Sequence, residues 1–388
     1  MATLSTPSLA FGPNLISKYP GSTGNDNVFL STARNEKEHE DPDHVQPSLC
    51  AVEQFTIGWI CALQEEYQAA CQMLDEELEP DGAESAITND ESIYVFGKLG
   101  DHYVVVGCLP MGSTGISSAT KVAADMARSF PNLKFALMVG IGGGAPNAAK
   151  KRDIRLGDVV VSVPQGQQHG VVQLDFGVRL SNGIFKRRGH LDAPPRALLA
   201  AIQEVQRRQK DPRKPDGIAH HIKRMDLMED YRRPPQDRLY KSDYHHREAT
   251  TTSQSDDEDD WEDLCHNCKE EGLVKRKERK TFRQVTIHYG TIASDNVVMR
   301  DAEVRDRHSS DDDLNILCFE MEAAGLMNDL RCLVIRGICD YADSHKNDDW
   351  HNYAALVAAA YARELLLVLR KVHVTSMPSW IGKIDHCK

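Results

Sequence analysis

The chain has 388 residues, of which 41% are hydrophobic and 27% charged, so it carries enough apolar material for a globular core. The 58 acidic side chains outnumber the 46 basic ones and give a net charge of −12, which argues against binding to a nucleic-acid backbone. The sequence contains neither an apolar run long enough for a membrane span nor a basic-then-apolar signal peptide. We therefore expect a cytoplasmic protein with no membrane or nucleic-acid partner.

The first segment of the chain lacks the pattern of folded structure. Residues 1–50 are rich in Pro, Ser, Gly, Asn and acidic groups without a periodic apolar stripe, which predicts a disordered arm. The apolar run Phe55–Ala62 then predicts a buried strand, and apolar residues at helical spacing over 67–78 predict a helix directly after it. Gly100-Asp101 lies between two apolar runs and predicts a hairpin, and the spacing over 116–130 predicts a second amphipathic helix.

The middle of the chain contains a strand, a glycine run and a long segment of different character. Phe135–Val139 predicts a strand that leads into Gly140–Gly144, which we expect to form a loop, and Asp158–Val163 predicts a further strand. From about 207 to 283 the chain opens basic, contains the acidic run Asp256–Asp263 and shows little apolar periodicity. This composition predicts a surface insertion of low order.

The last third of the chain returns to apolar runs that alternate between strand and helix patterns. They predict, in order, strands at Val285–Ala293 and Ile316–Phe319, a helix over 322–330, a strand at Cys332–Cys339 and a helix at Tyr353–Val372. Alternating strands and helices predict an α/β fold with a central mixed, largely parallel sheet. We expect one domain over residues 51–372, followed by a tail at 373–388.

Acidic residues stand at the ends of three predicted strands, where folds of this class gather their reactive groups. Glu66 follows the first strand, Glu320 and Glu322 flank Met321, and Asp340 ends the strand that begins at Cys332. A carboxylate accepts two hydrogen bonds, which suits a pair of sugar hydroxyls, and a partly buried Asp can be tuned to donate to a ring nitrogen. Each acid also has a purely structural interpretation, as negative charge at a helix N-terminus or as an N-cap.

The glycine run at 140–144 is a weaker signal. Gly140, Gly142 and Ala145 fit the loose dinucleotide pattern G-x-G-x-x-G/A, but no amphipathic helix follows them. A run of glycines either lets backbone N–H groups approach a ligand oxygen or only makes a turn, and both interpretations stay open.

The order of the motifs is more specific than any one of them. The set WICAL…EE, MVGIGGG, LGDVVVS, HYGTIAS, CFEMEAAG and IRGICDYADSH resembles the nucleoside phosphorylase and nucleosidase superfamily over about residues 55–372. In particular, it is similar to the branch found at the N-termini of fungal NLR-like multidomain proteins. The resemblance implies a single α/β domain whose mixed sheet curls into a distorted barrel. It also implies cleavage of the bond between a ribose anomeric carbon and a base nitrogen, with a purine nucleoside or nucleotide as substrate and no cofactor.

The resemblance assigns a role to each matching residue. Glu322 would grip the ribose hydroxyls and Met321 would pack against the sugar. Asp340 would engage the purine ring and assist its departure, and Glu66 would activate water as in the hydrolytic branch. The remaining matches are Gly142 and Gly143 near the anomeric centre, and Val298 at the place of a base-stacking aromatic residue.

The chain departs from the phosphorylase pattern in a way that favours hydrolysis. Met138 and Ile141 stand where phosphorylases of the superfamily place phosphate-binding arginine and serine, and Glu66 stands where they tend to use arginine. A phosphate-dependent phosphorylase and a non-catalytic nucleoside-sensing module remain the alternatives. Some members of the similar branch hydrolyse adenine nucleotides, for which the candidate phosphate-binding cations are Arg155, Arg300 and Arg305.

Cys265 and Cys268 form a single C-x₂-C within the insertion. Such a pair supplies two zinc ligands, and His245, His246 or His288 could complete a tetrahedral site. No second C-x₂-C exists in the sequence, so two incidental thiols are the favoured interpretation and we expect no metal site. Assembly into a homo-oligomer stays open.

Overall fold

The computed structural model describes residues 50–380, except 84–86, 88–89, 182, 248–264 and 266. The arm predicted at 1–50 and the acidic run Asp256–Asp263 therefore lie outside the described residues, apart from position 50. In the described part of the chain, no helix is both long and apolar enough to cross a membrane.

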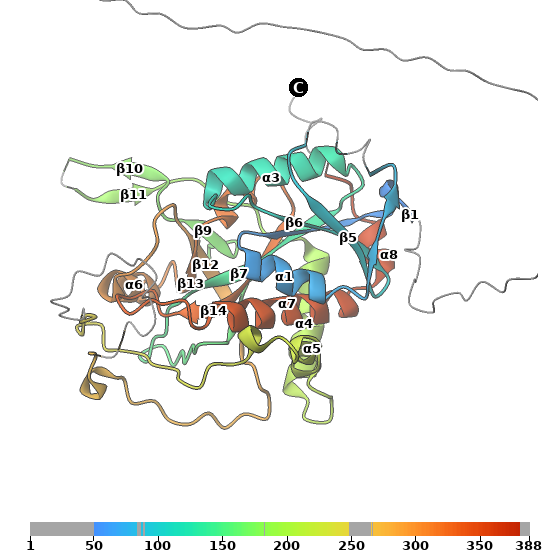
Figure 1. Cartoon of the computed structure of the whole chain (residues 1–388). Coiled ribbons are helices and arrows are strands. Elements are labelled where there is room, and N and C mark those ends of the chain that lie inside the picture. Colours follow the sequence, from blue (N-terminus) through green and yellow to red (C-terminus); the bar gives the residue numbers. More distant parts are fainter. Residues whose placement is uncertain are drawn as a thin grey trace, which may run out of the picture. The chain divides into compact units, whose positions relative to one another are not determined.

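A ten-stranded mixed sheet forms the centre of the fold (Figure 1). Its strands follow the order β13-β12-β8-β14-β7-β2-β6-β5-β3, and β9 pairs with β12. The pairings around β2, β7, β12 and β14 are mostly parallel, whereas the predicted hairpin at Gly100-Asp101 joins β5 and β6 in antiparallel fashion. The strands are β2 (Ile57–Cys61), β3 (Glu76–Leu78), β5 (Tyr94–Leu99), β6 (His102–Cys108), β7 (Phe135–Gly144), β8 (Val159–Ser162), β9 (Val171–Gln173), β12 (Ile287–Ser294), β13 (Ile316–Glu320) and β14 (Cys332–Asp340).

One end of the sheet closes on itself. Strand β13 pairs in parallel with β12 and, in antiparallel fashion, also with β7, where Cys318 lies opposite Gly144 and Phe319 opposite Gly143. The strands β7, β14, β8, β12 and β13 therefore form a closed ring, from which β2, β6, β5 and β3 extend. The expected single α/β domain, with a largely parallel sheet that curls into a barrel, is confirmed.

The glycine run differs from the loop that we expected. Strand β7 continues through the glycines to Gly144, pairing with β14 and then with β13. A Cβ atom at Gly143 would lie 2.8 Å from Oδ1 of Asp340, so a side chain there would collide with the end of β14. The glycines thus let three strand ends converge, which is why the run is strand rather than turn.

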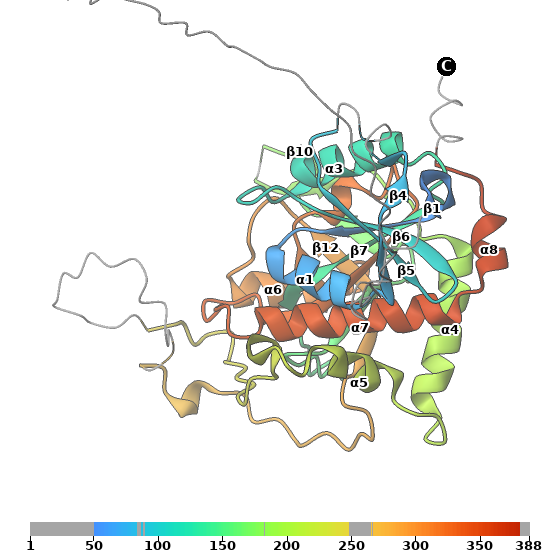
Figure 2. The ribbon, with the colours of Figure 1, turned by 45° about the vertical axis from the view of Figure 1, so that its right-hand side comes forward.

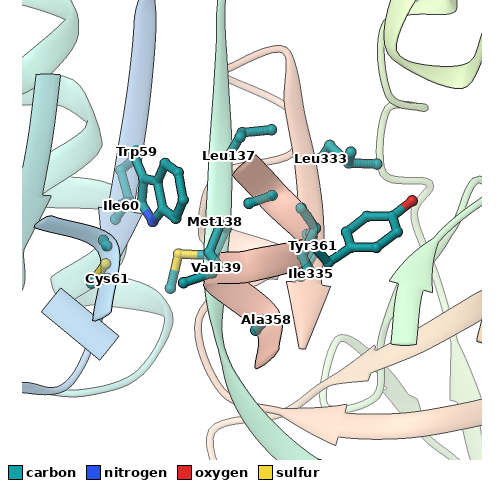
Figure 3. Close-up of a cluster of buried hydrophobic side chains, with 14 of the residues drawn as sticks. Trp59, Ile60, Cys61, Leu137, Met138, Val139, Leu333, Ile335, Ala358 and Tyr361 are labelled. Carbon is teal, nitrogen blue, oxygen red and sulfur yellow. The ribbon is translucent and has the colours of Figure 1, made fainter. Parts of the chain in front are cut away.

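Helices cover both faces of the sheet. Figures 1 and 2 show α3 (Ile116–Ser129) on one side, with α1 (Gln64–Gln72) and α7 (His351–Val368) on the other. Helix α7 packs on β7 and β14 and is itself covered by α1, α4 (Arg196–Lys210) and α5 (Gly217–Ile222), so its apolar residues are buried nearly all round. Figure 3 shows this core, in which Trp59 of β2, Leu137 of β7 and Tyr361 of α7 lie among the apolar side chains.

The helix that we expected over 322–330 is wrong. The chain makes only one 3₁₀ turn, at Ala323–Gly325, and then a series of turns before β14. The backbone N–H groups of Glu322 and Ala323 donate to the Glu320 carboxylate at the end of β13, so this turn is held by the preceding strand end. The remaining elements are β1 (Cys50–Ala51), β4 (Pro80–Asp81), β10 (Gly177–Arg179), β11 (Phe185–Arg187), α6 (Ala302–Ser310) and α8 (Lys371–Thr375).

Polar contacts hold the described parts of the 207–283 segment against the domain. Three arginines anchor its return: Arg276 donates to Asp237 and to the Tyr341 hydroxyl, Arg279 to Asp153 and Asp158, and Arg283 to carbonyls at the end of α4. In the predicted tail, Trp380 is buried and its backbone N–H donates to Leu133. Apolar periodicity in the sequence cannot detect a segment that is held in place mainly by polar contacts.

Candidate active site

One cleft contains all the residues that the sequence predicted for catalysis and for binding the sugar and the base. It opens where β7, β13 and β14 end, and its volume is about 900 Å³ with its open mouth included. The predicted residues that line it are Glu66, Gly142, Gly143, Val298, Met321, Glu322 and Asp340. Residues far apart in the sequence therefore meet at one edge of the sheet, as the carboxyl ends of strands in α/β folds do.

Glu66 is the third residue of α1 and is buried at the base of this cleft. Its carboxylate accepts hydrogen bonds from three backbone N–H groups, those of Ala62 at 2.7 Å, Leu63 at 3.1 Å and Ile141 at 2.8 Å. A Cβ atom at position 140 would lie 2.3 Å from Glu66 Oε1, so only glycine allows this contact with β7. Burial raises the pKa of Glu66 to about 7, although Arg336 and the backbone N–H groups favour the ionised form.

Arg336 is a residue that we did not predict. It lies on β14, is fully buried, and donates to Glu320 and, at 3.4 Å, to Glu322. Its guanidinium is also 3.9 Å from the Glu66 carboxylate. Burial lowers the pKa of Arg336, but the neighbouring carboxylates together outweigh it and raise the pKa, so the guanidinium carries a positive charge. We call Glu66, Glu320, Glu322 and Arg336 the acid–arginine cluster.

The sequence contains a signal for Arg336. It is the one charged residue within Cys332–Cys339, a run that reads as a buried strand. An arginine on a strand with both faces buried needs charged partners, because a lone buried charge is prohibitively costly. Its partners, however, follow from the tertiary fold and not from spacing.

Glu322 lies beside this guanidinium, one residue after the half-buried Met321. Its Oε1 accepts a hydrogen bond from the Gly115 backbone N–H at 3.1 Å, just before α3. Burial raises the pKa of Glu322, Arg336 opposes this shift and Glu320 adds to it. The carboxylate is therefore fixed from two sides at the wall of the cleft.

Asp340 ends β14 and forms an ion pair with Lys346, whose Nζ is 3.0 Å from its Oδ2. The Ala342 backbone N–H donates to Oδ1 at 2.7 Å, and the Cys339 thiol lies 3.1 Å from Oδ2. Burial raises the pKa of Asp340, but Lys346 and these hydrogen bonds outweigh it and hold the pKa below its usual range. Asp340 is thus ionised, and not tuned towards the protonated form that the sequence interpretation considered.

Lys346 and His351 are two further cleft residues that sequence reasoning missed. Lys346 Nζ is 3.5 Å from His351 Nε2, and His351 Nδ1 is 3.2 Å from the Glu65 carboxylate. These contacts connect Asp340 with the first turn of α1, on which Glu66 also lies. No motif marks either residue in the sequence.

The cations that line the cleft are already paired with carboxylates. Among the described lining residues the fixed positive charges are Arg336 and Lys346, which contact Glu320 and Asp340 respectively. The three arginines proposed for a 5′-phosphate do not line it. Arg155 binds Asp153, Arg305 is buried against Asp306 and the Tyr341 carbonyl, and Arg300 donates to the Lys346 carbonyl.

Part of the cleft lining is apolar. It is formed by Val297, Val298, Met299 and Phe319, with Ile141 beside the acid–arginine cluster. The side chain of Val298 is 45% exposed at the mouth, whereas Phe319 is buried and supplies the one phenyl ring among the described lining residues. The cleft lining thus combines carboxylates with apolar side chains against which a flat apolar group could pack.

Comparison with known proteins gives no matching family model. A nucleotide-binding leucine-rich repeat (NLR)-like protein of Hyaloscypha variabilis is 41% identical over 359 residues, which cover 88% of this chain and 33% of that protein. The chain thus spans about a third of the length of this curated relative.

The solved structures that match include a futalosine hydrolase and a nucleosidase, both at low sequence identity. Futalosine hydrolase of Helicobacter pylori is 15% identical, with a TM-score of 0.47 and coverage of 81% of this chain and 97% of that one. A 5′-methylthioadenosine/S-adenosylhomocysteine nucleosidase of Neisseria meningitidis, in complex with methylthio-immucillin-A, is 15% identical with a TM-score of 0.49, covering 81% and 99%. The chain is therefore similar in sequence to part of an NLR-like protein.

Proposed function

We propose that this chain hydrolyses the N-glycosidic bond of a purine nucleoside or nucleotide. The observation that carries the proposal is the meeting of Glu66, Glu322 and Asp340 in one cleft. The three carboxylates would divide the three tasks of the reaction, which are water activation (Glu66), ribose binding (Glu322) and base departure (Asp340).

The acid–arginine cluster suits the sugar. As the base leaves, positive charge develops on the ribose, and preorganised carboxylates stabilise such charge strongly in a site shielded from water. The cluster holds three carboxylates around one guanidinium, so it favours a cation. Glu322 borders the cleft and can accept hydrogen bonds from two neighbouring ribose hydroxyls.

Glu66 suits the activation of water. A carboxylate has about four acceptor sites, and three of those of Glu66 are filled by backbone N–H groups. One acceptor site remains on Oε1, where a water molecule can donate its proton. A pKa of about 7 matches a general base that works near neutral pH.

Asp340 suits the departing base. It lies in the same cleft as the apolar wall formed by Val297, Val298 and Phe319, against which a purine ring can pack. Because Asp340 is ionised, it can accept a proton from solvent and share it with a ring nitrogen, so that the purine leaves as a neutral base.

The pairing of cations in the cleft supports water over phosphate as the nucleophile. A phosphate dianion beside the ribose needs positive partners to offset its desolvation. Arg336 and Lys346 are engaged by carboxylates, and the carboxylates around Glu66 would repel the anion. We therefore propose hydrolysis, and a free sugar as the second product.

The substrate is identified by incubating the full chain with adenosine, inosine, guanosine, methylthioadenosine, AMP and ATP and measuring free base. We expect release from at least one of them, and at least a 10²-fold lower rate for Glu66→Gln. Asp230→Asn, at an exposed carboxylate outside the cleft, is the matched control. Binding without release of base by the wild type would support the sensing module instead.

A further inference from the structure

A second group of polar side chains lies beyond the acid–arginine cluster. It consists of Cys265, Cys268 and His246 from the 207–283 segment, and His345 from the loop that follows β14. We call these four residues the Cys–His cluster. The Nδ1 atom of His246 is 3.5 Å from Cys268 Sγ and 3.9 Å from Cys265 Sγ. One ligand atom each from His246, Cys268 and His345 lies within 4.8 Å of the others.

These distances fit the edges of a metal tetrahedron. Zinc binds thiolate sulfur at about 2.3 Å and imidazole nitrogen at about 2.0–2.1 Å, so sulfur and nitrogen on one ion are about 3.5 Å apart. The two cysteines are free thiols in a C-x₂-C, and the Cys268 backbone N–H donates to the Cys265 carbonyl at 3.0 Å. This turn brings the two thiols to the same imidazole.

His345 is the independent observation that points to a ligand. It is 93% buried, and neither of its ring nitrogens makes a hydrogen bond within the described residues. Its ring stacks on Tyr240, with the centroids 3.8 Å apart and the planes inclined by 13°. Nδ1 is 3.6 Å from the Asp343 carboxylate. A buried imidazole that lies near the Cys268 thiol and a carboxylate has the surroundings of a metal-bound histidine.

We propose that His246, Cys265, Cys268 and His345 bind one structural zinc ion. Two thiolates and two imidazoles make a closed tetrahedral set, which leaves no position for a water molecule and so favours a structural role. The proposal departs from the favoured interpretation of the two cysteines as incidental thiols. The spacing of the cysteines did not reveal the site, because His345 lies in another part of the chain, at the end of the motif that contains Asp340.

The position of the Cys–His cluster indicates what the zinc ion would do in the fold. His345 directly precedes Lys346, the ion-pair partner of Asp340. A cavity lined by Cys265, Tyr240 and His345 also reaches Cys339 and Asp340. Bound zinc would therefore tie the 207–283 segment to the loop that shapes one wall of the cleft.

The test is the metal content of the full chain, purified without chelator from zinc-supplemented medium. We expect about one zinc ion per chain in the wild type, and at least a tenfold lower content in Cys268→Ser and His246→Ala. The matched controls are Cys71→Ser, at a half-buried thiol on α1, and His245→Ala, at an exposed neighbouring imidazole. Both controls should retain zinc.

A cobalt spectrum of the wild type covers the case in which the variants do not fold. Cobalt(II) in place of zinc should give thiolate-to-metal charge-transfer absorption and the strong visible bands of a tetrahedral site. A wild-type chain that takes up neither metal, or Cys268→Ser with wild-type zinc content, overturns the proposal. Neither the zinc content nor the cobalt spectrum depends on catalysis, so the zinc proposal can be tested independently of the hydrolase proposal.

Discussion

The Glu66 carboxylate lies 3.9 Å from the Arg336 guanidinium, whereas Glu320 lies within hydrogen-bond distance of the same group. Arg336 therefore forms a hydrogen bond with Glu320, whereas it stabilises the negative charge of Glu66 only from a longer distance. This unequal sharing leaves a fully buried carboxylate whose pKa is about 7, poised between its two protonation states at neutral pH.

Base release should rise with pH through the pKa of Glu66. The ionised form is the base, so kcat/KM increases as the pH passes about 7 and levels off above it. The profile is measured from about pH 5 to pH 9 on the wild type and on Glu66→Gln, whose residual rate should lack this rise. A wild-type profile that is flat or falls across neutral pH would count against Glu66 as the base.

The raised pKa of Glu66 also predicts that its contribution to stability falls as the pH rises. A carboxyl group with a lowered pKa has the opposite effect. Folding raises the pKa of Glu66 from 4.5 to about 7, so its stabilising contribution is full below pH 4.5 and is lost as the pH rises through 7. Relative to the wild type, Glu66→Gln should therefore gain roughly 2–4 kcal/mol of unfolding free energy between about pH 5 and pH 8. Urea unfolding of both proteins at the two pH values measures it, and an unchanged difference would mean that Glu66 stays ionised throughout.

Glu322→Ala should reduce turnover of ribosides far more than that of their 2′-deoxy analogues. The lost hydrogen bond to a ribose hydroxyl involves a charged group, which is worth about 1.5–3 kcal/mol, or about 10- to 150-fold in kcat/KM. The deoxy substrate is the internal control, since it lacks one of the hydroxyls. Equal losses for both sugars would mean that Glu322 serves only to hold Arg336 and Gly115 in place.

Asp340→Asn should lower kcat by at least about 10²-fold while substrate still binds. The amide has the shape of the carboxylate but cannot accept a proton and share it with a ring nitrogen. Thermal unfolding monitors whether loss of the Lys346 ion pair disturbs the fold. Turnover near the wild-type level in a folded variant would remove Asp340 from the reaction.

Arg336→Met should destabilise the fold by about 3–5 kcal/mol, because it leaves Glu320 and its neighbours without their cation in the interior. Adding Glu320→Gln to this variant removes one of the unpaired charges and should recover part of the loss. Urea unfolding of the single and double variants gives both values. If the second substitution only adds to the damage, the two residues are not coupled through charge.

The sequence was sufficient to predict those site residues that follow directly after an apolar strand. Strand ends at Glu66, Glu322 and Asp340 could be predicted to converge, because apolar runs identify the strands and an α/β sheet gathers their carboxyl ends. The glycine run could not be interpreted in the same way. Its backbone conformation depends on Glu66 and Asp340 approaching β7, and these contacts come from residues far away in the chain.

Residues whose partners come from other elements could not be predicted. The sequence shows Arg336 as a single charged residue in an apolar strand. Its pairing with Glu320 and Glu322, however, depends on the pairing of β13 with β7. Lys346 carries no pattern, and the 207–283 segment is held through arginine contacts such as those of Arg279 with Asp158. Apolar periodicity registers burial of hydrophobic groups, not polar anchoring.

The most direct test of the hydrolase claim compares base release by the wild-type chain in phosphate-free buffer and in phosphate buffer, with analysis of the sugar product. The account predicts equal rates and a sugar that keeps its 5′ group and carries no anomeric phosphate, because the cations of the cleft are already paired with carboxylates. Release that requires phosphate and yields a sugar 1-phosphate would contradict it. Arg336 or Lys346 would then have to exchange its carboxylate partner for the anion.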